Sequence, residues 1–264
     1  MPGPLLTLTT DYGTSDQLVG TLKGVILKIQ PDAQIVDINH SVVPYDMLDG
    51  ALCIGAAYRF FPSKTVHIVV VDPGVGTERR PILVSANNQY FIAPDNGVLS
   101  LIYEREDPIV VRHITAEHYF LRPISATFHG RDIFAPVAAW LSKNWQTEAF
   151  GEVITDFTRF ALPRPKAQEG ALRGAVLRVD NFGNLITNFL LEDLPEAMRK
   201  PGPAKFTAAG KPVKHFVDIF AQGPAGEPVM LVGSTGFLEI AVNKGNAARV
   251  LGAGRGAEVS LKLA

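Results

Sequence analysis

The sequence has 264 residues, of which 47% are hydrophobic and 19% are charged, and its formal net charge is -1. This length suits one large domain or two modest ones, and the near-neutral charge gives no electrostatic basis for nucleic acid or a membrane surface as a partner. The single cysteine, Cys53, excludes an internal disulfide framework. No segment resembles a signal peptide or reaches the length of a membrane span, so a soluble cytoplasmic protein is expected.

Predicted strands alternate with predicted helices in the first part of the chain. The pattern indicates strands over 5–10, 34–39 and 65–71 and helices over 18–29 and 46–61. Ser15 is the predicted N-cap of the first helix, and Pro31 and Pro62 end the two helices. This order predicts an α/β domain with a mostly parallel β-sheet covered by helices.

Two short strands and a third helix complete this predicted domain. Residues 82–85 and 90–93 flank Asn87-Asn88, the one local hairpin signal in the chain. The apolar run over 133–141 predicts a helix, which would place His129 at a loop-to-helix junction. We assign residues 1–162 to this amino-terminal domain.

The remainder of the chain has a different pattern. Residues 163–171 form a proline-containing linker without apolar periodicity. Beyond it, short apolar runs separated by glycine and proline occur at 175–179, 185–190, 213–220, 229–232, 237–242 and 259–263. Residues 172–264 are therefore predicted to form a smaller, all-β domain, either a sandwich or a barrel.

Two aspartates end early strands of the predicted sheet. Asp11 follows the first strand, and Asp72 follows the third, just before Pro73 and Gly74. Ligands of open α/β sheets bind in the crevice outside the carboxyl ends of the strands, and a carboxylate there can accept two hydrogen bonds from the vicinal hydroxyls of a ribose. Each aspartate could instead cap the amides of its own loop or of the following helix.

Seven motifs, in order along nearly the whole chain, carry a family resemblance. They are Thr-Thr-Asp-Tyr-Gly-Thr (9–14), His-Ser-Val-Val-Pro-Tyr-Asp (40–46), Asp-Pro-Gly-Val-Gly (72–76), Ala-Pro-Asp-Asn-Gly (93–97), Phe-His-Gly-Arg-Asp (128–132), Asp-Asn-Phe-Gly-Asn (180–184) and Ser-Thr-Gly-Phe-Leu-Glu-Ile-Ala (234–241). The chain resembles the adenosine-forming S-adenosylmethionine hydrolases, also called SAM hydroxide adenosyltransferases, which are relatives of the fluorinating and chlorinating enzymes that act on the same substrate.

The resemblance implies hydrolysis of S-adenosylmethionine to adenosine and L-methionine by a triad of Asp72, Arg79 and His129. The sulfonium is already a good leaving group, so the enzyme must supply a water or hydroxide aligned with the C5′–S bond in a pocket that excludes bulk water. The carboxylate could orient the imidazole or accept a hydrogen bond, while the arginine favours hydroxide. Arg80 competes for the arginine role, although the motif register favours Arg79.

Further residues are implied to bind the substrate. In the amino-terminal domain these are Asp11 on the ribose hydroxyls and Tyr45 and Phe128 as walls of the ribose pocket. In the carboxy-terminal domain they are Asp180 on the methionyl ammonium, Phe182 and Asn184 on the adenine, and Ser234 and Phe237 in a segment whose amides could meet the adenine edge or the carboxylate. Aromatic core packing and a β-turn over 180–184 are the structural alternatives.

No cofactor or metal is expected, because the six histidines are scattered and S-adenosylmethionine is itself the substrate. The resemblance implies a homotrimer with its sites at subunit interfaces. A halogenase that delivers chloride or fluoride to C5′ is less favoured, since the halogenating relatives replace the acidic and histidyl positions that this chain retains. A non-catalytic sensor of adenosine or S-adenosylmethionine stays open.

Overall fold

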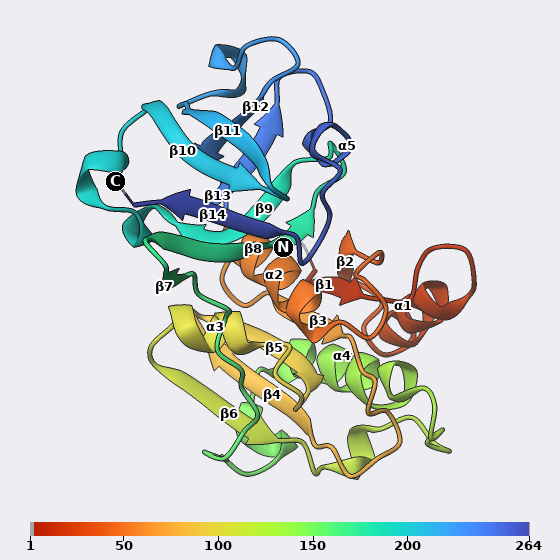
Figure 1. The fold of residues 1–264 in the computed structure, drawn as a ribbon. Coiled ribbons are helices and arrows are strands. Elements are labelled where there is room, and N and C mark those ends of the chain that lie inside the picture. The colour runs from red at the N-terminus through yellow and green to blue at the C-terminus, as the bar shows by residue number, and fades with distance from the viewer. Residues whose placement is uncertain (1–2, 264) are drawn as a thin grey trace. The chain divides into compact units, whose positions relative to one another are not determined.

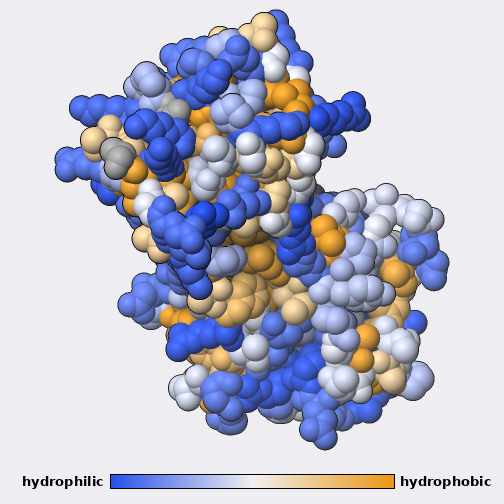
Figure 2. Space-filling view, in the orientation of Figure 1, coloured by the Kyte–Doolittle hydropathy of each residue, from blue (hydrophilic) through white to orange (hydrophobic). Residues whose placement is uncertain are grey.

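The protein, described here by a computed structural model over residues 3–263, consists of two compact units that meet in sequence between Ala161 and Leu162. Unit 1 (3–161) is a helix-covered sheet, and unit 2 (162–263) is built mainly from strands (Figure 1). Hydrophilic side chains cover much of the visible face of each unit (Figure 2). Within the described residues, no helix is both long and apolar enough to cross a membrane.

The sheet of unit 1 has six strands in the order β2-β1-β3-β5-β4-β6. Their bounds are β1 (Leu5–Thr10), β2 (Gln34–Asn39), β3 (Val66–Val70), β4 (Pro81–Ala86), β5 (Gln89–Pro94) and β6 (Ile109–His113). The pairs of β1 with β2, β1 with β3, and β3 with β5 are parallel, and β4 alone runs against its neighbours β5 and β6. The predicted mostly parallel sheet is therefore confirmed.

Helices cover both faces of this sheet because its strands are apolar on both sides. Their bounds are α1 (Leu18–Ile29), α2 (Met47–Ala57), α3 (Ser100–Arg105) and α4 (Ala135–Asn144). Alternate residues of β3 point to opposite faces: Ile68 belongs to a core cluster with α1 and α4, whereas Val69 belongs to one with α2 and α3. The central strands are thus held from both sides, and their carboxyl ends are rigidly placed.

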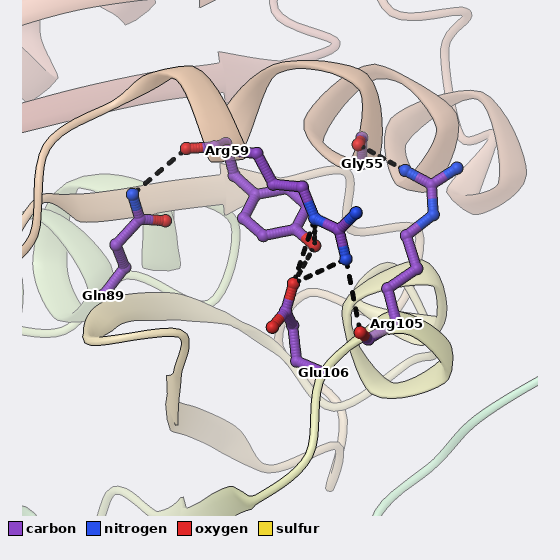
Figure 3. A network of polar contacts seen from close by, with 6 residues as sticks. Gly55, Arg59, Gln89, Arg105 and Glu106 are labelled. Carbon is purple, nitrogen blue, oxygen red and sulfur yellow. Dashed lines mark hydrogen bonds and ion pairs between the residues drawn. The ribbon is translucent and has the colours of Figure 1, made fainter. Parts of the chain in front are cut away.

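A polar network ties the end of α2 to the end of α3 (Figure 3). The Arg59 guanidinium donates to Glu106 Oε1 at 2.8 Å, and the Tyr58 hydroxyl donates to the same oxygen at 2.5 Å. Arg105 Nη1 donates to the Gly55 carbonyl at 2.7 Å, which caps the last turn of α2. This network braces the face of the sheet opposite α1 and α4.

Local details of unit 1 confirm the sequence prediction in one place and differ from it in two. The hairpin at Asn87-Asn88 is confirmed, and both residues have positive φ, as a tight two-residue turn requires. The prediction of Ser15 as an N-cap is wrong: Gln17 occupies that position, and the Leu18 amide donates to Asp16. A π-helical turn over Gly130–Phe134 precedes α4, a feature that apolar periodicity does not reveal.

Seven strands of unit 2 close into a barrel, which confirms the predicted all-β fold and decides between sandwich and barrel. The order is β14-β10-β11-β12-β13-β9-β8, and β8 pairs with β14 to close it. The bounds are β8 (Ala171–Val179), β9 (Leu185–Leu190), β10 (Gly202–Ala208), β11 (Lys211–Phe216), β12 (Pro228–Val232), β13 (Phe237–Val242) and β14 (Glu258–Lys262), with the short helix α5 (Ala247–Leu251).

Two elements of unit 2 carry little signal in the sequence. Strand β7 (Lys166–Gln168) lies in the segment 163–171 that was interpreted as a linker, and it pairs with the first residues of β8. Strand β10 includes Pro203 and Lys205, so it lacks the apolar run by which the other strands were predicted. Its inward residue Phe206 nevertheless packs into the barrel core.

Candidate active site and pockets

Asp72 and Arg79 form a buried ion pair at the carboxyl end of β3. Arg79 Nε lies 3.0 Å from Asp72 Oδ1 and 2.9 Å from Oδ2, and the two side chains are only 9% and 5% exposed. The loop between them turns at Gly76, where φ is 79° and a Cβ would lie 2.2 Å from the Ala126 carbonyl oxygen. Glycine is therefore required there for the loop to bring Arg79 back onto Asp72.

His129 joins this pair through the arginine. Arg79 Nη2 lies 2.7 Å from His129 Nδ1. Because a guanidinium can only donate, Nδ1 must accept, and the neutral ring then carries its proton on Nε2. Burial, and next the positive charge of Arg79, lower the pKa of His129 from its ordinary value, which favours the neutral ring. The three residues form the chain Asp72–Arg79–His129, with the arginine in the middle.

The neighbouring arginine has a different role. Arg80 Nε and Nη2 both donate to Asp95 Oδ2, and Nη1 donates to Asp156. Asp95 also accepts from the Thr158 amide. The Ala-Pro-Asp-Asn-Gly motif is thus a support that holds Arg80 away from Asp72, and Arg79 is the arginine that contacts the histidine.

A pocket of about 330 Å³ lies beside Asp72 in unit 1. It is lined by Asp11, Tyr12, Leu18, Pro44, Tyr45, Asp72, Val75, Thr127 and Gly130. Thr10 of β1 is in register with Val70 of β3, so Asp11 and Asp72 follow adjacent parallel strand ends. The structure therefore brings together the two aspartates that the strand pattern predicts to share a crevice.

Asp11 holds Tyr45 in an unusual backbone conformation. Asp11 Oδ2 accepts a hydrogen bond from the Tyr45 amide at 2.9 Å, and Tyr45 has φ of 65° and is 72% exposed. Burial raises the pKa of Asp11, an effect partly offset by this hydrogen bond. A left-handed tyrosine is strained and persists only where its surroundings impose it, so Asp11 fixes an aromatic side chain at the pocket rim.

Phe128 packs against Tyr12, which lines this pocket. Their ring centres are 5.8 Å apart in an edge-to-face arrangement, and the Arg131 guanidinium lies 5.1 Å from the Phe128 ring centre. Phe128, predicted as a wall of the ribose pocket, is not itself part of the lining and contacts the pocket through Tyr12. Sequence reasoning missed Tyr12, whose only signal is its place directly after Asp11.

Unit 2 has its own, larger pocket of about 820 Å³. Four predicted residues, Asp180, Phe182, Asn184 and Ser234, are among those lining it, and Phe182 is 74% exposed. The fifth, Phe237, is only 5% exposed at the start of β13 and is not part of this lining. The pocket also contains residues that the sequence analysis did not single out: Asp218, Ile219, Phe220, Leu231, Val232, Gly233, Glu239, Val242, Asn243, Lys244 and Gly245.

The Asp180 carboxylate is largely occupied by its own turn. Oδ1 accepts from the amides of Phe182 and Asn184 at 2.9 and 2.8 Å, and Oδ2 accepts from the Asn184 side chain at 2.8 Å. Gly183, with φ of 86°, completes the turn, and a Cβ there would meet the Asn246 side chain. Asp180 therefore organises the loop that presents Phe182 and orients Asn184.

Comparison with known proteins identifies the chain's family. A family model described as the SAM hydroxide adenosyltransferase N-terminal domain matches residues 6–151, and one described as the C-terminal domain matches residues 174–260. The chain belongs to the SAM hydroxide adenosyltransferase family. Together the two matches span most of unit 1 and most of unit 2.

Individual proteins are similar to this chain over nearly its whole length. The (R)-S-adenosyl-L-methionine hydrolase of Salinispora arenicola (strain CNS-205) is 36% identical over 256 residues, 94% of each chain. The crystal structure of an uncharacterized conserved protein from Thermotoga maritima superposes with a TM-score of 0.88 at 36% identity, covering 97% of this chain and 99% of that one. A fluorinase of Actinoplanes sp. (strain N902-109) is 30% identical over 274 residues, 91% of each chain.

No group of three or more histidine, cysteine, aspartate or glutamate side chains in the described part of the chain is arranged to hold a metal ion. The carboxylates of the unit 1 pocket have protein partners instead. Asp72 is paired with Arg79, and Asp11 with the Tyr45 amide.

Proposed function

We propose that this protein hydrolyses S-adenosyl-L-methionine to adenosine and L-methionine by direct attack of water on C5′. The observation that carries the proposal is the Asp72–Arg79–His129 chain at the edge of a pocket that also contains Asp11. Support comes from the family and from relatives named as hydrolases of this compound. The reaction as proposed needs no cofactor, because the sulfonium leaves as a neutral thioether.

In this proposal the residues of unit 1 have distinct tasks. Asp11 accepts hydrogen bonds from the ribose hydroxyls, and Tyr45 covers the sugar. The attacking water donates to the Asp72 carboxylate and accepts from His129 Nε2–H, the ring nitrogen that lacks a partner within residues 3–263. Arg79 holds the carboxylate and the imidazole in this relation, so the water is aligned before reaction.

In the chemical step the water oxygen forms a bond to C5′ while the C5′–S bond breaks and its electron pair stays on sulfur. The oxygen then carries an extra proton and is a strong acid, so even the ion-paired Asp72 carboxylate can accept that proton. General-base assistance contributes about 10²–10⁴-fold. Alignment and the exclusion of bulk water must supply the rest of the acceleration.

A carboxylate beside the nucleophile disfavours halide as an alternative. Chloride or fluoride would have to lie in a pocket that contains the two carboxylates Asp11 and Asp72, and like charges repel strongly where water is excluded. The same carboxylates attract the sulfonium and orient water. The retained acidic side chains therefore favour hydrolysis over halogenation.

We also propose that the protein is a cytoplasmic homotrimer whose sites lie at subunit interfaces, with a domain boundary near residues 163–171. Predicted binding residues are divided between the two units, and each unit carries a strongly exposed aromatic side chain, Tyr45 or Phe182, at its pocket. Exposed aromatic residues are typical of surfaces that become covered in an assembly. Light scattering on the eluting protein measures the subunit number.

The direct test is incubation of the purified protein with S-adenosyl-L-methionine in oxygen-18 water, with and without chloride, followed by mass spectrometry of the nucleoside. Adenosine labelled at its 5′ oxygen is the expected product. A 5′-halogenated nucleoside would instead identify a halogenase. Binding without any product would identify a sensor and overturn the proposed hydrolysis.

A further inference from the structure

Asn96 joins the end of β5 to the end of β3 beside Asp72. The main-chain pairing of β3 with β5 ends where Ile68 lies opposite Ile92. Beyond that point, Asn96 Nδ2 donates a hydrogen bond to the Val71 carbonyl at 2.8 Å. This carbonyl belongs to the planar peptide unit whose nitrogen is that of Asp72. The hydrogen bond therefore fixes the peptide from which the Asp72 side chain projects.

The oxygen of the Asn96 side chain is used as well. Asn96 Oδ1 accepts from the Val98 amide at 3.1 Å, so one side chain accepts from its own turn and donates to the end of β3. Helix α2 packs closely against the two residues that Asn96 joins: a Cβ placed on Gly50 would lie 2.9 Å from Val98 Cγ2 and 3.0 Å from Val71 Cγ2. Asn96 thus connects a turn to a strand end in closely packed surroundings.

Asp95, the preceding residue, holds the other end of the same loop. Its amide donates to the Arg80 carbonyl at 2.8 Å, a contact between main-chain atoms that does not depend on the Arg80 side chain. Asp95 Oδ2 also accepts from Arg80 Nε at 2.9 Å. The loop over 72–79 carries the carboxylate and the guanidinium of the proposed catalytic chain. Asp95 and Asn96 therefore hold the two residues that flank this loop.

Asn96 can act on the site only through other residues. It is half-buried, and it is not among the described residues that line the pocket beside Asp72. The loop also has hydrogen bonds of its own, from the Val75 amide to the Asp72 carbonyl at 3.3 Å and from the Thr77 amide to the Gly74 carbonyl at 3.1 Å. These bonds shape the loop without joining it to the sheet, whereas the Asn96 bond joins its first peptide to the end of β5.

We propose that Asn96 is a positioning residue for the hydrolysis: by holding the Val71 carbonyl, it sets the direction of the Asp72 carboxylate toward the attacking water. The inference rests on the proposed function. The reaction is sensitive to such placement, because a misplacement of about 1 Å can cost about 10²-fold in rate. Asparagine suits this position because its amide donates through nitrogen and accepts through oxygen at the same time.

The test compares Asn96→Asp with the wild type in the full-length protein. Aspartate has the same size and can still accept from the Val98 amide, an arrangement common in turns, but an ionised carboxylate cannot donate to the Val71 carbonyl. For S-adenosyl-L-methionine, kcat is expected to fall about 10- to 100-fold. KM and the Kd for adenosine should change less than about threefold, because the contacts to the ligand are unaltered. A residue that served only its own turn would leave kcat at the wild-type value in this variant.

Asn96→Ala and Ser100→Ala form a matched pair that separates positioning from stability. Ser100 Oγ also bridges two main-chain groups, because it donates to the Gly97 carbonyl at 2.6 Å and accepts from the Phe160 amide at 3.0 Å. Neither group belongs to the segment 71–80. The melting temperature, measured by calorimetry, should fall by similar amounts in the two variants, since each loses two hydrogen bonds. Only Asn96→Ala should lose kcat.

The outcomes distinguish this inference from the proposed function. Turnover by the wild type with unchanged kcat in Asn96→Asp would overturn the role of Asn96 and leave the hydrolysis intact. Equal losses of kcat in Asn96→Ala and Ser100→Ala would overturn it too, because they would reflect stability alone. So would a weakening of adenosine binding as large as the fall in kcat, since Asn96 would then support the whole pocket. A wild type that does not hydrolyse S-adenosyl-L-methionine would overturn the proposed function and this role with it.

Discussion

The two pockets differ in how their charged groups are satisfied. In unit 1, Asp72, Arg79 and His129 are joined to one another before any ligand arrives. In unit 2, the Asp180 carboxylate accepts hydrogen bonds from its own turn, while Glu239 is buried without a hydrogen-bond partner among the described residues. A group that aligns a reacting water must already be oriented, because reorganisation during reaction costs rate. A group that recognises a ligand must keep hydrogen-bonding capacity that no other part of the chain uses.

This difference predicts which substitutions change turnover and which change affinity. Substitutions within the connected chain of unit 1 should lower kcat, since they disturb groups that act on the water. Substitutions at groups that hold the substrate equally in its ground and transition states should raise KM alone.

The largest effect is expected for Arg79→Lys. Lysine keeps the positive charge beside Asp72 but cannot bind the carboxylate through two nitrogens and the imidazole at once. We expect kcat to fall about 10²- to 10⁴-fold with little change in KM, as measured by steady-state kinetics. Arg80→Lys is the matched control, because Arg80 binds Asp95 and Asp156, and its kcat should stay within a fewfold of wild type. Equal losses in the two variants would contradict the assignment.

A smaller effect, on binding, is expected for Asp11→Asn. The amide can still accept the hydrogen bond from the Tyr45 backbone, but it is a weaker acceptor for ribose hydroxyls than a carboxylate. Kd for adenosine, measured by calorimetry, should rise about 10- to 100-fold. Asp16→Asn, an exposed position next to α1, should leave Kd unchanged. Unaltered affinity in a folded Asp11→Asn protein would remove Asp11 from the site.

A still smaller effect, a modest rise in KM, is expected for Asp180→Asn. One amide oxygen can replace the acceptor of the Phe182 and Asn184 amides, and reorientation of the Asn184 amide can restore the remaining contact. KM for S-adenosyl-L-methionine, measured by steady-state kinetics, should therefore rise only about threefold, the scale of a fraction of one hydrogen bond. A rise of about 100-fold would instead show that the charge of Asp180 itself binds the substrate.

The smallest expected effect concerns the pH dependence of activity, which reports the protonation of His129. His129 must be neutral to accept from Arg79, and its pKa lies below the ordinary value of 6.5 because of burial and the arginine charge. Activity should thus be constant just above pH 6.5 and fall only as the pH drops through the lowered pKa. In Arg79→Gln the loss of positive charge should move the His129 titration, followed by NMR, to higher pH. A shift to lower pH would contradict the contact.

Much of unit 1 follows from local patterns. The alternation of apolar strands and amphipathic helices is a property of neighbouring residues, so it correctly predicts the sheet and places Asp11 and Asp72 at strand ends. The Asn87-Asn88 turn is equally local. Strands β7 and β10 were not predicted, because they lack an apolar pattern of their own. Pairing of β7 with β8 and of β10 with β14 holds them in the sheet.

The partner of each polar side chain was decided by the tertiary structure alone. Arg79 and Arg80 are adjacent in sequence, yet one meets His129, fifty residues away, and the other meets Asp156, seventy-six residues away. The use of Asp180 by its own turn and the isolation of Glu239 beside Gly233 likewise depend on how strands close the barrel. Sequence by itself determined the fold class and the family, because patterning is local and repeated. Tertiary packing alone determined which charges are paired, because a hydrogen bond depends on the positions of two distant segments within a few tenths of an ångström.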